Sequence, residues 1–218
     1  MSSFKNETVN TAFEGGVINI IIAHLTKCGT QMRMDCVNSH PLENNEDKIT
    51  NRLVSTYLNA EPNNFRYEPQ SLEHYDEETN CYIGRTDIKV ISGDYFRDSQ
   101  AYYIIECKCI DGTSNLNRKY VTEGVARFLI PTAKPKYSSY YAQNIMLGYV
   151  IRSINIPENT AKIKKLQNQI LENVTANDFL LLCHAGLDYY VYTCQYQSDK
   201  RNIELRHLFY DLSAAMCN

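Results

Sequence analysis

The sequence predicts an α/β domain in which helices flank a central mixed β-sheet, with additional strands at the C-terminal end. Short apolar runs with alternating side-chain character predict strands, and they are separated by longer stretches with apolar residues at helical spacing. The 218 residues, 44% of them hydrophobic, suffice for one domain with a substantial core. Because no linker, internal repeat or low-complexity tract divides the chain, we expect a single domain over residues 1–218.

The first part of the chain carries mixed signals. Residues 1–16 are polar and end in Gly15-Gly16, so we expect an N-terminal arm or a strand that clasps a partner. The apolar segment 17–28 is compatible with either a buried helix or a buried strand. The composition of residues 29–45 is typical of a loop.

The remaining elements alternate between helices and strands, with the core of the domain at about 44–152 and a C-terminal helix and strands over 157–212. Apolar residues at helical spacing predict helices at about 44–59, 117–130 and 157–174. Residues 74–80 are acidic and are expected to form a solvated loop. Alternating or continuous apolar runs predict strands at 65–68, 85–91, 102–110, 144–152, 179–183, 189–197 and 203–212.

The stretch from Ile83 to Ile110 gathers charged side chains inside two apolar strands. Side chains alternate along a strand, so Glu106 and Lys108 share one face of the second strand. If Val90 pairs with Tyr103, then Asp87 lies opposite Glu106, and Arg85 joins them on the same face. Carboxylates buried in apolar strands are unfavourable unless they are compensated, and a divalent cation held by oxygen ligands would compensate them.

Asp87 followed by Glu106-Cys107-Lys108 resembles the motif of the PD-(D/E)XK nuclease superfamily, which has the restriction-endonuclease-like fold. Thr86 stands where that superfamily usually has proline. The placement also agrees, since a hydrophobic strand, a loop and a hydrophobic strand ending in the motif are followed by a helix. The resemblance covers about residues 44–152. It implies a restriction-endonuclease-like core and hydrolysis of phosphodiester bonds in DNA, with RNA as an alternative substrate.

The resemblance also implies roles for individual residues. Asp87, Glu106 and Lys108 would be catalytic. Glu46, Asp87, Glu106 and the backbone carbonyl of Cys107 would hold one or two Mg²⁺ ions, for which Mn²⁺ can substitute. Lys108 would orient or deprotonate the attacking water.

Helical spacing selects Glu46 over its neighbours Glu43 and Asp47, because it projects from the same side as Ile49. An acidic first turn that favours the helix dipole is the alternative interpretation of Glu46. Tyr120 and Arg127 would grip the substrate phosphate or orient the lysine, and a solvated helix face is the alternative for both.

The tract from Tyr120 to Val150 is similar to a subgroup of these nucleases found near bacterial defence loci. That likeness implies an endonuclease in restriction or anti-phage defence, with a partner protein from a defence system. Cutting both strands of a duplex generally needs two sites, so we also expect a homodimer. The apolar segment from Val17 to Leu25 is a candidate for its interface, or else packs in its own core.

Composition narrows the remaining possibilities. A net charge of −3 argues against a protein that coats nucleic acid by bulk electrostatics. Without an export signal or a membrane span, the eight cysteines are expected to be reduced thiols in the cytoplasm. Their spacing does not indicate a zinc site. His207 is expected to be a packed histidine.

Two rival interpretations stay open. The first is a catalytically silent subunit that keeps the nuclease fold and acts as a nucleic-acid-binding or scaffolding partner. The second treats Asp87 with Lys108, and Glu106 with Arg85, as structural cross-strand salt bridges in an unrelated protein.

Overall fold

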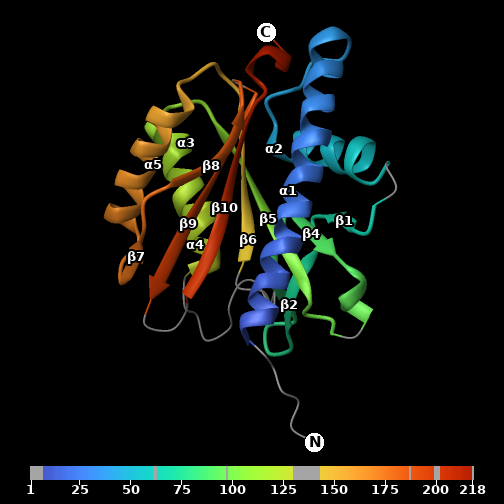
Figure 1. Cartoon of the computed structure of the whole chain (residues 1–218), viewed down its shortest axis with the longest axis vertical. Coiled ribbons are helices and arrows are strands. Elements are labelled where there is room, and N and C mark those ends of the chain that lie inside the picture. Colours follow the sequence, from blue (N-terminus) through green and yellow to red (C-terminus); the bar gives the residue numbers. More distant parts are fainter. Residues whose placement is uncertain are drawn as a thin grey trace, which may run out of the picture.

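A mixed β-sheet of eight strands forms the centre of the molecule (Figure 1). The computed structural model describes residues 7–60, 63–96, 98–129, 143–186, 188–198 and 202–217. The strand order is β1-β4-β5-β6-β10-β9-β7, and β8 also pairs with β9. Strands β5 and β10 both run parallel to β6, and the other pairs are antiparallel. The strands are β1 (Arg66–Pro69), β4 (Ile88–Ile91), β5 (Tyr102–Ile110), β6 (Gln143–Val150), β7 (Val174–Ala176), β8 (Leu180–Ala185), β9 (Tyr189–Ser198) and β10 (Asn202–Asp211).

Two further strands, β2 (Leu72–Asp76) and β3 (Cys81–Arg85), form a separate antiparallel hairpin.

Helices cover both faces of the sheet, with α1 and α2 on one side and α3, α4 and α5 on the other (Figure 1). Helix α2 continues into the π-helical turn η1, and α3 is joined to α4 by the π-helical turn η3. The helical elements are α1 (Glu7–Asn38), α2 (Glu46–Arg52), η1 (Leu53–Leu58), the 3₁₀ turn η2 (Gly93–Phe96), α3 (Ser114–Lys119), η3 (Tyr120–Val125), α4 (Ala126–Leu129), α5 (Ile156–Ile170) and the 3₁₀ turn η4 (Ser213–Ala215). No helix within the described ranges is long and apolar enough to cross a membrane.

Strand β5 is buried along its whole length because each of its faces packs into a different core. Tyr103, Ile105 and Cys107 point toward α1 and η1, where Leu25 and Leu58 are also buried. On the opposite face, residues of β5 meet the side chains of η3, α4 and α5. This is the alternation of faces that the sequence predicted.

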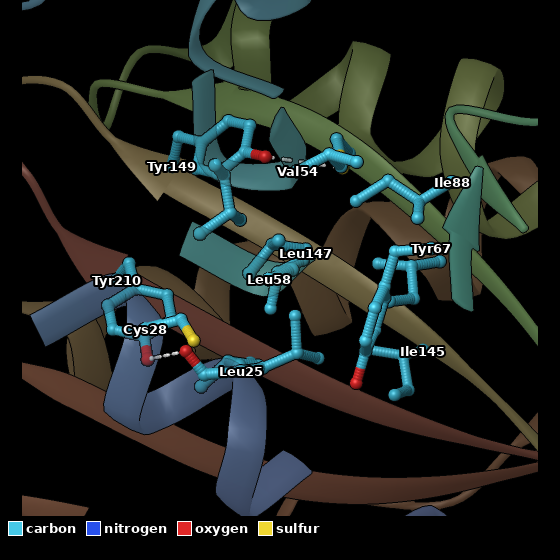
Figure 2. Packing of buried hydrophobic residues seen from close by; sticks show 14 of the residues in the cluster. Leu25, Cys28, Val54, Leu58, Tyr67, Ile88, Ile145, Leu147, Tyr149 and Tyr210 are labelled. Carbon is cyan, nitrogen blue, oxygen red and sulfur yellow. Dashed lines mark hydrogen bonds between the residues drawn. The ribbon is translucent and has the colours of Figure 1, made fainter. Parts of the chain in front are cut away.

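Figure 2 shows the core between α1 and the sheet, where Tyr210 of β10 donates a hydrogen bond to the carbonyl of Leu25 at 2.7 Å. A side chain at Gly29 would clash with the ring of Tyr210, so the glycine allows α1 to approach β10 closely.

Most of the predicted elements are confirmed. The chain is an α/β protein with a mixed sheet, and the helices expected at about 44–59, 117–130 and 157–174 are present with small shifts at their ends. The predicted register is also correct, since Val90 lies opposite Tyr103 and Ile88 lies opposite Ile105. Strand β6 is internal, between β5 and β10, as expected.

The predictions for the N-terminal region are wrong where the structure describes it. Helix α1 begins at Glu7 and continues to Asn38, so residues 7–16 are not an arm and residues 29–38 are not a loop; residues 1–6 of the predicted arm lie outside the described residues. The helix persists through its glycines because tertiary packing offsets their low helix propensity. The buried residues recur at intervals of three and four and face the sheet: Ile18, Ile21, Ile22, Leu25, Cys28, Met32 and Cys36.

The strand expected at 85–91 is instead divided between two sheets. Strand β3 ends at Arg85 and β4 begins at Ile88, so Arg85 belongs to the hairpin and does not share a sheet face with Asp87. The acidic segment 74–80, expected to be a loop, begins inside β2. Strand β7 was not predicted.

Candidate active site

The candidate site lies along the part of the β5 edge that β4 does not cover. Strand β4 pairs with β5 only as far as Ile105. Beyond that point two carboxylates accept the backbone N–H groups of β5. Asp87 Oδ2 accepts from Cys107 N at 2.7 Å, and Glu46 Oε2 accepts from Cys109 N at 2.9 Å. Because buried backbone N–H groups require partners, these bonds fix both carboxylates against the strand.

Lys108 of β5 occupies the centre of the site. Its Nζ lies 2.9 Å from Glu46 Oε1, 3.4 Å from Asp87 Oδ2 and 3.0 Å from Glu106 Oε1. Nζ also donates to the backbone carbonyl of Cys107 at 2.5 Å. Only 7% of the Lys108 side chain is exposed. Three carboxylates from α2, from the residue before β4 and from β5 thus surround one buried cation.

Arg127 of α4 completes the cluster by pairing with Glu106, whose side chain is fully buried. Gly124 of η3 faces the sheet beside this cluster. A Cβ at that position would lie 2.5 Å from Met146 Cε and 3.5 Å from Lys108 Cγ. Gly124 thus lies directly over Met146 and the stem of Lys108.

The carboxylates determine the charge of Lys108. Burial alone would lower its pKa, but Glu106, Asp87 and Glu46 outweigh burial and hold the pKa of Lys108 above its ordinary range. In this arrangement Lys108 is a cation at neutral pH. The neighbouring thiols are not ionised, because burial raises the pKa of Cys109 to about 12 and raises that of Cys107 as well.

A cavity of about 580 Å³ opens above the cluster. Its walls come from the start of α2, from the β2–β3 hairpin, from β5 and from the η3–α4 segment. The lining residues are Asn45, Glu46, Asp47, Leu72, Tyr82, Ile83, Gly84, Arg85, Asp87, Lys108, Glu123 and Arg127. The charged cluster can therefore be reached from solvent.

The donor set fits a hard divalent cation such as Mg²⁺, which prefers carboxylate and carbonyl oxygens. Glu46, Asp87 and Glu106 supply the carboxylates, and Cys107 supplies the carbonyl. In the conformation described here these oxygens are arranged around the Lys108 ammonium. Accordingly, no three His, Cys, Asp or Glu side chains in the described part of the chain already form a metal-binding group. A metal ion at this position would require Lys108 to withdraw from the carboxylates.

The structure brings together most of the predicted site residues, namely Glu46, Asp87, Glu106, Lys108, the Cys107 carbonyl and Arg127. Helical spacing correctly predicted that Glu46, and not Glu43 or Asp47, lies beside Lys108. Glu43 pairs with Lys48 at the surface, and Asp47 is exposed at the cavity wall.

Tyr120 is not brought to the site. It is fully buried, its hydroxyl lies 2.9 Å from His207 Nδ1, and its ring stacks on Phe209. It has no exposed surface to offer a substrate, so it does not enter the proposal below. His207 is packed as expected, between Tyr120 and Tyr196.

Of the two ion pairs in the rival salt-bridge interpretation, Asp87–Lys108 is formed at 3.4 Å, whereas Glu106 pairs with Lys108 and Arg127 and not with Arg85. Sequence reasoning also missed the contribution of the β2–β3 hairpin and of Glu123 to the cavity wall. Residues 81–85 show no clear alternation, and nothing in the sequence indicates that a hairpin there lines the same cavity as Lys108.

Comparison of the chain with models of known protein families, with curated proteins and with solved structures finds no significant match.

Proposed function

We propose that this protein is a metal-dependent nuclease that hydrolyses phosphodiester bonds in DNA. The observation that carries the proposal is the convergence of Glu46, Asp87 and Glu106 on Lys108 at the floor of an open cavity. The resemblance to the PD-(D/E)XK superfamily supplies the substrate class. The order of the elements supports it, because the motif lies at the end of β5, after β4 and before the helical segment α3–α4.

The chain's own residues have distinct tasks in this proposal. Glu46, Asp87, Glu106 and the Cys107 carbonyl would hold Mg²⁺, which when bound polarises the phosphoryl oxygen and lowers the pKa of a bound water. Lys108, once released from the carboxylates, balances phosphate charge and orients the attacking water. Arg127 fixes Glu106 and presents a guanidinium to the cavity.

The second candidate is that these charged residues form a structural network of ion pairs without catalytic function. The position of Lys108 among the carboxylates supports this alternative. Its ammonium already neutralises carboxylates that a metal would otherwise bind. Buried ion pairs of this kind occur in proteins without catalytic function. A catalytically silent nuclease-fold subunit is less favoured, because the Asp, the Glu and the Lys of the motif are all present and lie together.

Cleavage of closed circular and linear DNA tests the proposal. We expect the protein to nick or linearise circles in Mg²⁺ or Mn²⁺ and not in a chelator, which would identify it as an endonuclease. Asp87→Asn should reduce cleavage by at least about 100-fold, because it weakens a metal ligand. The matched control is Glu43→Gln, an exposed acid of the neighbouring segment, which should leave cleavage unchanged. Metal-independent cleavage, or equal cleavage by Asp87→Asn, would refute the proposal.

The biological setting remains part of the proposal. We place the enzyme in the cytoplasm, in bacterial restriction or anti-phage defence with a partner protein, as the resemblance implies. None of the eight cysteines, all of which lie in the described ranges, forms a disulfide; reduced thiols are usual in a cytoplasm. In the segment from Val17 to Leu25, the side chains of Ile18, Ile21, Ile22 and Leu25 pack in the chain's own core, while Ile20 is 59% exposed. Most of the segment is therefore buried within the subunit, and the expected homodimer stays part of the proposal.

A further inference from the structure

The β2–β3 hairpin contributes apolar side chains to the wall of a cavity that is otherwise highly charged. Leu72 of β2 and Tyr82 of β3 both line the cavity, and they are 55% and 52% exposed. Arg85, at the end of β3, also borders the cavity, but it lies opposite Leu72 and projects from the other face of the hairpin than Tyr82 does. A single exposed apolar residue is ordinary on a protein surface. An exposed tyrosine that lines a cavity beside a cluster of carboxylates and lysine is less ordinary.

The hairpin is fixed to the strands that carry the site. Its base is joined to Asp87 by a backbone hydrogen bond from Gln70 N to the Asp87 carbonyl at 2.9 Å. Glu73 is only 2% exposed, accepts a hydrogen bond from the Tyr102 hydroxyl of β5, and pairs with Lys89 of β4 at 3.5 Å. The wall is therefore held in register with the carboxylates.

The ring of Tyr82 is braced from the neighbouring strand. Tyr75 lies opposite Tyr82, and their ring centroids are 5.2 Å apart at an angle of 62°, which is an edge-to-face contact. Half of each ring stays exposed. A ring held in this way loses little conformational freedom when a second flat group packs on it.

Aromatic rings that are exposed beside a phosphate-handling site are suited to stacking on nucleobases, and the stacking does not depend on base identity. The cavity volume of about 580 Å³ falls in the range of small-molecule sites, which suits one or two nucleotides. In a duplex the bases are stacked on one another, and an unpaired base is needed for stacking on a side chain.

We propose that the β2–β3 hairpin is a base-stacking wall of the active site, and that the site takes an unpaired nucleic-acid strand, with a base on Tyr82. The inference rests on the proposed nuclease function and narrows its substrate from DNA in general to single-stranded segments.

Binding and cleavage measured in parallel test this inference. Binding is followed by fluorescence anisotropy with a labelled oligothymidine and with a duplex of equal length, in Ca²⁺, which is also ligated by oxygen. We expect the single strand to bind at least about tenfold more tightly than the duplex. Tyr82→Ala should weaken binding of the single strand by about 5- to 150-fold, the range for loss of one stacked base, and Tyr82→Phe should retain it. The matched control is Phe96→Ala, which removes a 91% exposed ring that does not line the cavity and should bind as the parent does.

The outcomes separate the two proposals. Equal affinity for duplex and single strand, parent-like binding by Tyr82→Ala, or no binding of either oligonucleotide would overturn the inference. Mg²⁺-dependent cleavage that is equal on both substrates and unaffected by Tyr82→Ala would support the nuclease function and refute base stacking on the hairpin. Binding of single strands that depends on Tyr82, with no cleavage under any condition, would support base stacking on the hairpin and refute the nuclease function.

Discussion

Replacing Lys108 with methionine should destabilise the metal-free protein strongly. Methionine keeps a flexible stem of similar length in the same space, so the substitution chiefly removes the positive charge. It leaves Glu46, Asp87 and Glu106 close together without the ammonium that separates them. Of these three carboxylates, Glu106 keeps its ion pair with Arg127.

The size of the effect follows from the burial of the cluster. The side chains of Lys108, Asp87 and Glu106 are 7%, 12% and 0% exposed, so solvent screens their interactions weakly. Breaking a buried ion pair by removing one partner costs about 3–5 kcal/mol. For a chain of this length, that loss corresponds to a fall in melting temperature of roughly 6–20 °C.

Thermal and urea denaturation with and without Mg²⁺ measure this effect. Because a metal would replace the missing charge, Mg²⁺ at about 100 times its dissociation constant should restore about 2.7 kcal/mol to Lys108→Met. Lys48→Met is the control, since Lys48 pairs with Glu43 at the surface and its loss should cost less than about 1 kcal/mol. A loss below 1 kcal/mol at Lys108, or a large loss that Mg²⁺ does not reverse, would refute this reasoning.

Three further predictions follow from other parts of the structure. Glu46→Gln should reduce cleavage by at least about tenfold while Glu43→Gln does not, and the opposite order in a cleavage assay would show that the wrong acid was assigned. Burial lowers the pKa of His207 from 6.5 to about 3. Between these two values the imidazole is protonated in the unfolded chain and neutral in the folded one, so the free energy of unfolding is highest above pH 6.5 and falls as the pH drops toward 3, by about 1.4 kcal/mol per pH unit. Urea midpoints measured between pH 6.5 and 4 should therefore fall less steeply in His207→Gln, and equal slopes would contradict the assignment. Gly29→Ala should cost about 1–3 kcal/mol by forcing α1 away from Tyr210, and an unchanged urea midpoint would show that the helix adapts.

The part of the site that lies on the antiparallel strands β4 and β5 and on helix α2 could be predicted from the sequence. Alternation along β5 placed Glu106 and Lys108 on one face, and the matching of apolar faces fixed the register of Val90 against Tyr103. Helical phase placed Glu46 on the side that reaches the strand. These features depend on local periodicity, which a single sequence records directly.

The sequence did not suffice where tertiary contacts override local composition. The glycines and polar residues of the first 45 positions indicated an arm and a loop, but packing of α1 against the sheet keeps residues 7–38 helical. Tyr120 recurs with Arg127 at helical spacing, yet the π-helical turn between them places Tyr120 in the core. The chain passes from β3 to β4 between Arg85 and Ile88, and this boundary depends on where the β2–β3 hairpin packs. The hairpin is held by contacts of Glu73 with Tyr102 and Lys89, which are 29 and 16 residues further along the chain and so leave no local pattern in the sequence.

In the proposed function, the carboxylates around Lys108 bind a divalent cation. Calorimetric titration of the parent protein and of Asp87→Ala with Mg²⁺ and Mn²⁺ tests it most directly. We predict saturable heat with the parent that is lost in Asp87→Ala, because that variant lacks a carboxylate ligand. An absence of metal-dependent heat in the parent, or the same heat in both proteins, would contradict the claim and leave the cluster as a structural network of ion pairs.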